Sequence, residues 1–232
     1  MPKLRLEITK DEAIRYISHL DYARTLERTI RRAKLPVAYS EGFNPHMKLS
    51  FASALAVGIT SDAEYVDIEF TEAVQPETIV FRLLQRVPQG IRIQKAKSIP
   101  ERGQSLMASV NLAAFTIDTP LLPDKSAAMA YHSLESFNRA EQIFYTKESP
   151  KGRRVIDVKQ FLLKKLEIAV TGGRIKVKAD IKITPIGSIK PSDILQVLVE
   201  QFTFPADKNA ALINRDGLYI LAQQGKLTPL DI

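Results

Sequence analysis

The chain contains no cysteine among its 232 residues. This absence excludes disulfides, thiolate zinc sites, a cysteine nucleophile and an iron–sulfur cluster held by the chain's own thiolates. The sequence also lacks any apolar run near the roughly 18 residues that a membrane span requires. We therefore expect a cytoplasmic protein that has no membrane partner and binds neither a metal nor a cofactor.

Sequence signatures of common enzyme classes are absent as well. The chain has no phosphate loop of the P-loop type, no GxGxxG after a strand, no HExxH and no GxSxG. What it does have is positive charge, with 33 Lys plus Arg against 26 Asp plus Glu and a net charge of +7. This excess favours an anionic partner, which could be nucleic acid, acidic protein or lipid headgroups.

The first part of the chain alternates strand and helix patterns. Residues 4–8 alternate apolar and charged side chains, and a helical pattern runs from Ser18 to about Lys34. The segments that follow, in chain order, are strands at 37–39 and 64–70, a helix that starts at Pro76 and a strand at 91–97. This β, α, β, β, α, β order is that of a ferredoxin-like unit.

A similar pattern restarts after residues 98–106, which lack periodicity and are predicted to be a linker. The predicted elements are strands at 109–119 and 142–146, a helix at 126–139, a hairpin of 162–170 and 175–183 across Thr171-Gly172-Gly173, a helix at 191–202 and a strand at 211–213. We therefore predict an α+β protein of two ferredoxin-like (βαββαβ) units in tandem, with domains at 1–98 and 107–232.

An arginine stripe runs along the first predicted helix. Arg24, Arg28 and Arg32 fall at i, i+4 and i+8, and Arg31 lies beside them. Like charges at this spacing destabilise a helix by a few tenths of a kcal/mol per pair, roughly, so the stripe favours an anionic partner such as phosphate. The alternative is a solvated face with a Glu27–Arg31 ion pair, opposite a buried face formed by Ile17, Leu20, Leu26 and Ile30.

The loop Gly42-Phe43-Asn44-Pro45-His46 follows that helix and contains an Asn-Pro turn signal. Phe43 could stack on a base, His46 could bind phosphate or act as a general base, and Lys48 could add charge. We therefore assign Phe43, Asn44, His46 and Lys48 to a nucleic-acid site. The alternative places Phe43 in the core and lets His46 cap a carbonyl.

A second basic concentration extends from Lys151 to Lys182. On its last strand, alternate residues share one face, so Arg174, Lys176, Lys178 and Lys182 could bind a sugar–phosphate backbone. An equally good interpretation is a strand that only keeps the surface soluble.

A catalytic or metal-binding group is a further possibility. Ser18 and Asp21 have the spacing of a helix-capping box. His19 and Asp21 could instead form a proton-transfer or metal-binding pair, to which His46 could contribute. The candidate catalytic residues are therefore His19, Asp21 and His46.

The sequence resembles a known family in three segments, at residues 15–70, 153–162 and 187–198. They look like the bacterial radical SAM-linked proteins, also called the DUF2344 domain. The matching positions are Ser18, His19, Asp21, Arg24, Glu27, Arg28, Arg31, Arg32, Ser40, Gly42, Phe43, Asn44, Pro45 and His46. Many relatives have proline where this chain has Met47.

The resemblance implies an association with a radical SAM enzyme, because members are encoded beside one or fused to one. A chain without cysteine cannot hold the radical SAM cluster itself, so that chemistry would belong to the partner. We expect a non-catalytic, RNA-binding accessory protein that presents tRNA or rRNA to this partner. The alternatives are a hydrolytic or RNA-processing enzyme that uses His19, Asp21 and His46, and a module that only docks onto the radical SAM enzyme.

Overall fold

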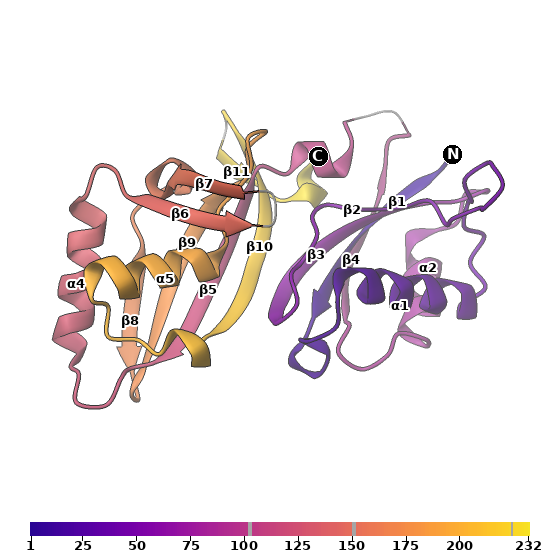
Figure 1. Ribbon diagram of the computed structural model, residues 1–232. Coiled ribbons are helices and arrows are strands. Elements are labelled where there is room, and N and C mark those ends of the chain that lie inside the picture. Colours follow the sequence, from indigo (N-terminus) through magenta and orange to yellow (C-terminus); the bar gives the residue numbers. More distant parts are fainter. Residues whose placement is uncertain (102–103, 150–151, 224) are drawn as a thin grey trace. The chain divides into compact units, whose positions relative to one another are not determined.

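The computed structural model describes residues 1–101, 104–149, 152–223 and 225–232 (Figure 1). Residues 102 and 103 of the predicted linker, and Lys151 of the second basic segment, lie outside the described residues. The fold is of mixed α+β class, with a large, mostly antiparallel sheet and five α-helices among the described residues. No helix in this part of the chain is long and apolar enough to cross a membrane.

The chain forms two compact units. Unit 1 comprises Met1–Asn111 and Arg215–Ile232, and unit 2 comprises Leu112–Asn214. The domains predicted from the sequence, 1–98 and 107–232, differ from these units chiefly in the last residues, which belong to unit 1. That part of the chain carries Arg215, whose guanidinium pairs with Glu64 inside unit 1.

Unit 1 contains most of the predicted functional residues. Its elements, in chain order, are β1 (Lys3–Lys10), a 3₁₀ turn (Glu12–Ile14), α1 (His19–Arg32), β2 (Leu49–Phe51), β3 (Ile59–Glu69), α2 (Pro76–Leu84), β4 (Ile93–Ile99), α3 (Leu106–Ser109), the later part of β10 (Leu212–Ala222), β11 (Gly225–Leu227) and a 3₁₀ turn (Pro229–Asp231). Strand β1 lies between β4 and β3 in antiparallel pairing, and β2 pairs with the other edge of β3.

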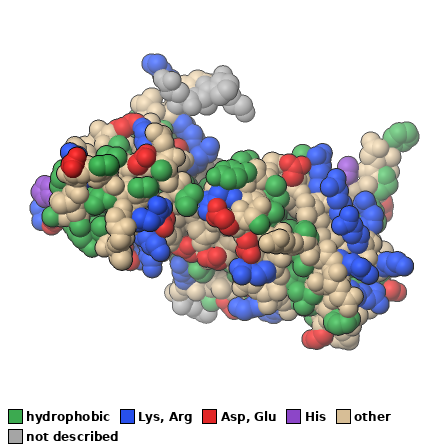
Figure 2. All heavy atoms as spheres, turned by 90° about the horizontal axis from the view of Figure 1, so that it is seen from below, with side chains coloured by type: hydrophobic (Ala, Val, Ile, Leu, Met, Phe, Trp, Pro, Cys, Tyr) green, Lys and Arg blue, Asp and Glu red, His purple; other side chains and the backbone are tan. Residues whose placement is uncertain are grey.

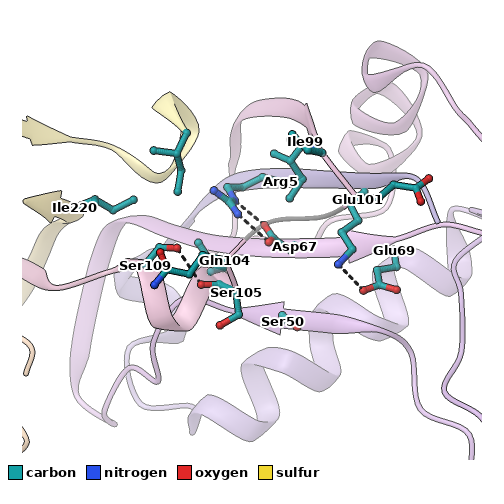
Figure 3. Close-up of a pocket in the computed structure, with 14 residues that line it drawn as sticks. Arg5, Ser50, Asp67, Glu69, Ile99, Glu101, Gln104, Ser105, Ser109 and Ile220 are labelled. Atoms are coloured by element: carbon teal, nitrogen blue, oxygen red, sulfur yellow. Dashed lines mark hydrogen bonds and ion pairs between the residues drawn. The ribbon is translucent and has the colours of Figure 1, made fainter. Parts of the chain in front are cut away.

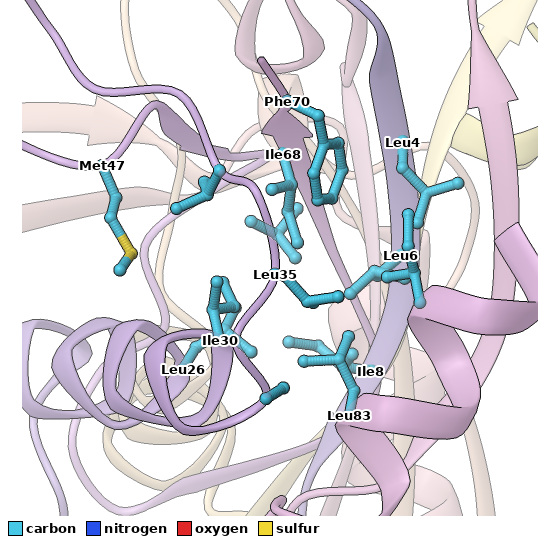
Figure 4. Close-up of a cluster of buried hydrophobic side chains, with 14 of the residues drawn as sticks. Leu4, Leu6, Ile8, Leu26, Ile30, Leu35, Met47, Ile68, Phe70 and Leu83 are labelled. Carbon is cyan, nitrogen blue, oxygen red and sulfur yellow. The ribbon is translucent and has the colours of Figure 1, made fainter. Parts of the chain in front are cut away.

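The alternation of apolar and charged side chains along β1 decides which face of the sheet the helices of unit 1 cover. Leu4, Leu6 and Ile8 point to one face of the sheet, where they form a core with side chains of α1 and α2 (Figure 4). Arg5 and Glu7 alternate with them and belong to the opposite face. Both long helices of unit 1 therefore cover the same sheet face, and this common face fixes where their ends lie.

Unit 2 contains the second basic segment. Its elements are β5 (Leu112–Pro120), α4 (Ala127–Arg139), β6 (Phe144–Ser149), β7 (Gly152–Asp157), a 3₁₀ turn (Val158–Phe161), β8 (Glu167–Thr171), β9 (Arg174–Lys182), α5 (Pro191–Phe202), a 3₁₀ turn (Lys208–Ala210) and the first residues of β10. Strand β9 lies between β5 and β8, while β6 and β7 form a separate two-stranded sheet.

The predicted helices are confirmed within a residue or two at the start and within three at the end, and the hairpin across Gly172-Gly173 is confirmed as well. The strand predicted at 37–39 is wrong: Val37 and Tyr39 form only isolated bridges, because Pro36 and the exposed loop at 41–46 interrupt the pairing. The structure adds β2, α3, β7 and β11, and α3 replaces the start of the strand predicted at 109–119. It also lengthens β10 beyond the predicted 211–213; charged and glycine residues in β7 and β10 hid the strand pattern.

Candidate functional site

Helix α1 begins with a side-chain cap. Ser18 precedes the helix, and its Oγ accepts the Asp21 N–H at 3.1 Å and donates to Asp21 Oδ2 at 2.7 Å. This hydroxyl satisfies one of the unpaired amides at the helix start. The Ser18 cap is as predicted, whereas the Asp21 carboxylate accepts from the Ser18 hydroxyl and not, as in a capping box, from the backbone.

The arginine face of α1 consists of Arg24, Arg28, Arg31 and Arg32, and all four side chains are exposed. Arg24 lies 3.7 Å from Asp21, measured from Nη1 to Oδ1. In the part of the chain that the structure describes, the other three arginines make no ion pair, and the predicted Glu27–Arg31 pair is not formed. These guanidinium groups are thus open to a ligand.

The opposite side of α1 packs into the core of unit 1. Tyr22, Leu26, Thr29 and Ile30 are buried there. The sequence-based assignment of Leu20 to this face is wrong, because 58% of its surface is exposed. Because this core holds the helix in place, the backbone positions of the arginines on its outer side are fixed.

Three further cations adjoin the arginine face where α1 and α2 end. A cavity of about 300 Å³ is lined by Arg32, Ala33, Lys34, Arg82, Gln85 and Arg86. The sequence analysis missed Lys34, Arg82 and Arg86, because α1 and α2 are far apart in the chain and only their packing on one sheet face unites them. In Figure 2, Lys and Arg side chains gather in the right-hand part of the surface, which unit 1 forms.

The loop at residues 41–46 projects into solvent. Phe43 is fully exposed, so the alternative that places it in the core is wrong. Gly42 has φ +121°, a conformation that favours glycine, and the loop closes where His46 N–H donates to Ser40 Oγ at 3.0 Å. An exposed aromatic ring on such a loop is free to stack on a base, as predicted.

Lys48 differs from the other predicted members of this site. Its Nζ lies 3.7 Å from Glu69 Oε2 and its side chain is half-buried. The Nζ also lies 3.8 Å from Met1 Sδ. Lys48 is therefore engaged within unit 1.

His19 lies at the start of α1 beside buried charges. Its ring packs edge-to-face against Phe51, with 5.0 Å between ring centroids. Burial lowers the pKa of His19, the charge of Glu64 partly opposes that shift, and Arg215 and Lys10 add to it. His19 is therefore held in its neutral form over a wider pH range than a free histidine.

The buried charges near His19 are paired. Arg215 Nε donates to Glu64 Oε1 at 2.7 Å, and Arg215 Nη2 contacts Glu64 Oε2. Lys10 Nζ donates to the carbonyls of Arg15 at 2.8 Å and Ile17 at 3.1 Å, and burial lowers its pKa. These groups fix the backbone ahead of α1 and so position the helix.

The three candidate catalytic residues do not come together. Asp21 is held by Ser18, and His46 lies in the exposed loop, whereas His19 packs on Phe51. No contact among the described residues joins His19 to His46, and no group of three or more His, Asp or Glu side chains there could hold a metal ion. The catalytic hypothesis stays a prediction that the geometry does not favour.

The β9 face of unit 2, formed by Arg174, Lys176, Lys178 and Lys182, has the predicted alternation. Lys176 and Lys178 are exposed, while the residues between them are buried. Carboxylates lie among these cations, however: Arg174 Nε donates to Asp118 at 2.8 Å, and Lys178 is directly opposite Glu167 on β8. Lys182 Nζ donates to the Gln160 carbonyl at 3.3 Å.

A separate pocket of about 480 Å³ lies on the sheet face of unit 1 opposite α1 and α2, where α3 forms part of its lining (Figure 3). Arg5 crosses it and pairs with both oxygens of Asp67, at 2.6 and 2.9 Å, and donates to the Pro229 carbonyl at 2.5 Å. Lys3 pairs with Glu69 at 2.9 Å. Both cations that line this pocket are therefore paired with carboxylates, and a third lining carboxylate, Glu101, pairs with the N-terminal amino group at 2.7 Å.

Comparison with known proteins places the chain in a family. The family described as "Uncharacterized protein conserved in bacteria (DUF2344)" matches residues 3–191, which include α1, the loop at 41–46 and the β9 face. The chain belongs to the DUF2344 family. This result confirms the family suggested by the sequence.

Other comparisons add little about this DUF2344 protein. None of the curated proteins matches it. A solved structure titled "Crystal Structure of an Unknown Protein from Galdieria sulphuraria" is similar at 9% identity, over 93% of this chain and 97% of that one, with a TM-score of 0.28.

Proposed function

We propose that this DUF2344 protein is a non-catalytic accessory protein that binds RNA, such as tRNA or rRNA, through unit 1. The observation that carries the proposal is the arginine face of α1, on which Arg28, Arg31 and Arg32 make no ion pair within the described residues. Forked guanidinium groups match phosphate oxygens in geometry as well as in charge. A row of them along a helix suits a sugar–phosphate backbone.

The exposed ring of Phe43 supports RNA in preference to other polyanions. A solvent-exposed phenylalanine on a glycine-containing loop has little to contribute to folding. It offers a π-face on which an unpaired base can stack, which is the common mode of contact with single-stranded RNA. Phosphate contacts from α1 would then hold the strand while Phe43 contacts a base.

We also propose that a radical SAM enzyme acts on the bound RNA. This part rests on the family resemblance and on the chemistry of the chain, which has no thiolates for an iron–sulfur cluster. In unit 1, β4, β1, β3 and β2 pair in that order, all antiparallel, with two helices on one face. On this basis we propose a ferredoxin-like arrangement for unit 1.

The test is the salt dependence of binding to bulk tRNA. We expect Arg24→Gln with Arg28→Gln to weaken binding and to reduce the slope of log K against log salt by about 1.5, because two phosphate contacts are lost. Lys176→Gln with Lys178→Gln removes the same charge from unit 2 and serves as the control. If both double variants weaken binding equally, the net charge and not the arginine face is responsible.

A second candidate function, docking onto the partner enzyme, is favoured by exposed apolar side chains near α1. Tyr16 is 74% exposed and Val57 57% exposed. Hydrogen bonds between Arg15 and Gly58, at 2.8 and 3.1 Å, hold their two segments together. Tyr16→Ser with Val57→Ser should then abolish copurification with the radical SAM enzyme while leaving tRNA binding unchanged. Retained copurification would contradict docking at this patch.

A further inference from the structure

The charged residues that line the cavity between the ends of α1 and α2 are all cations. Of its six lining residues, four are cationic and none is acidic: Arg32, Lys34, Arg82 and Arg86 are joined only by Ala33 and Gln85. Its volume of about 300 Å³ corresponds to roughly ten water molecules in the liquid. We call it the helix-end notch.

The backbone at both helix ends directs these side chains into the notch. Lys34 follows α1 with φ +51°, and Leu35 N–H bonds to the Ile30 carbonyl at 3.4 Å while Lys34 N–H bonds to the Arg31 carbonyl at 3.1 Å. These two bonds form a Schellman motif, in which the left-handed residue is usually glycine. Here a lysine occupies that position, although the left-handed conformation favours glycine, and it adds a cation at the helix end.

The end of α2 closes in a similar way. The N–H groups of Arg86 and Val87 bond to the Leu83 carbonyl at 2.9 and 2.8 Å. Because backbone amides already satisfy these carbonyls, the cations are not required to cap them. Within the described residues, none of the four cationic side chains makes a hydrogen bond or an ion pair.

Favourable interaction with the helix dipoles explains only part of this arrangement. A cation in the last turn is stabilised by the negative end of the helix, and Arg32 and Arg82 fit that role. Lys34 and Arg86 lie beyond the last helical residues and bring further positive charge to the same cavity. Four cations that repel one another around one cavity indicate an anion with more than one charge.

We propose that the helix-end notch binds a phosphate group. A phosphate offers several charged oxygens, which match the forked donors of three arginines and the ammonium of one lysine. The group could come from the RNA of the proposed function or from a free phosphorylated compound. The notch includes α2 and does not depend on the RNA proposal.

The experiment uses tripolyphosphate as the probe, with calorimetric titration of the full chain at low salt. We expect saturable binding at one site and a loss of affinity of about tenfold in Arg82→Gln with Arg86→Gln, since two exposed charge contacts are removed. Arg82→Lys with Arg86→Lys keeps the charge but not the forked donors, so its loss of affinity should be smaller than that of the Gln variant. The control is Lys176→Gln with Lys178→Gln, for which we expect less than about a twofold change. Equal losses in both double Gln variants, or none in Arg82→Gln with Arg86→Gln, would overturn the proposal.

A second arm identifies the source of the phosphate. If it belongs to RNA, Arg82→Gln with Arg86→Gln should lower the salt slope of tRNA binding by about 0.7 to 0.9. If that slope is unchanged while tripolyphosphate binding is lost, the notch holds a free phosphorylated compound. Should the wild type bind tripolyphosphate but not tRNA, the proposed function fails and the phosphate site stands.

Discussion

The arginine face of α1 and the β9 face of unit 2 each present four cations, yet they differ in what lies beside those cations. On α1 the nearest carboxylate belongs to Asp21, 3.7 Å from Arg24, and it also contacts the Ser18 hydroxyl. On β9, Arg174 donates to Asp118 at 2.8 Å and Lys178 lies opposite Glu167. A row of cations therefore forms an anion site only if neighbouring elements leave it unneutralised.

The kind of cation adds to this difference. The α1 face consists of arginines alone, whose planar forks can hold two oxygens of one phosphate at once. The two exposed cations of the β9 face are lysines, Lys176 and Lys178, which act as point charges. We therefore expect RNA affinity to depend mainly on α1, and four measurements can challenge or refine this contrast.

The largest effect is expected from removing most of the arginine face. Replacing Arg24, Arg28 and Arg31 by Gln should reduce tRNA affinity about thirtyfold, at ~0.7 kcal/mol for each exposed contact. It should lower the salt slope by roughly 2 to 3. Filter binding of tRNA over a range of salt concentrations measures both quantities. An unchanged slope would mean that RNA, if bound, contacts another surface.

The next effect concerns the loop beyond α1. Phe43→Ala should weaken binding to an unpaired RNA strand about tenfold, because stacking on one base contributes ~1 to 3 kcal/mol. The salt slope should stay the same, since no charge is lost. Phe43→Tyr is the matched control and should retain wild-type affinity. A loss of protein stability in Phe43→Ala, seen by thermal unfolding, would instead indicate a structural role for the ring.

The two long helices of unit 1 followed from local sequence patterns. Apolar spacing and the Ser18 cap predicted α1, and Pro76 predicted the start of α2. Strand β7 escaped prediction because its residues, Gly152–Asp157, include neighbouring charges and show no apolar alternation. The spacing of apolar residues detects only elements that bury one face, and the hairpin of β6 and β7 buries few side chains of β7.

The candidate site was predictable only in part, for a related reason. The arginines of α1 share a helix, so spacing alone placed them on one face. Arg82 and Arg86 join Arg32 through tertiary packing, which no local pattern reports. In the same way, two of the carboxylates beside the β9 face lie on other strands, Asp118 on β5 and Glu167 on β8, whereas Asp180 lies on β9 itself.

A third, smaller effect tests whether those carboxylates explain the contrast. Asp118→Asn with Glu167→Gln should raise tRNA affinity about threefold, because Arg174 loses its ion-pair partner and the negative charge that pairs with Lys164 and lies opposite Lys178 is removed. The same measurement on Asp124→Asn with Glu141→Gln, exposed acids of unit 2 that make no ion pair within the described residues, gives the effect of net charge alone. Equal gains in the two double variants would contradict our explanation of why the β9 face differs from α1.

The smallest effect expected is a pH dependence specific to the start of α1. Burial lowers the pKa of His19 below its ordinary value near 6.5. As the pH falls, His19 is therefore protonated at a higher pH in the unfolded chain than in the folded one. The resulting stability is complete above that ordinary value and is lost as the pH falls through the pKa of the folded state. Protonation would add positive charge beside Lys10 and Arg215, which the charge of Glu64 offsets in part.

His19→Gln removes this titration while keeping a polar side chain of similar reach. The free energy of unfolding in urea should therefore fall less between about pH 7 and about pH 5 in the variant than in the wild type. His132→Gln, in unit 2, is the control for losing a histidine as such. If the wild type and His19→Gln lose stability in parallel, then His19 exchanges protons equally in the folded and unfolded chains. In that case the buried charges at the start of α1 would not give unit 1 a pH dependence of stability that unit 2 lacks.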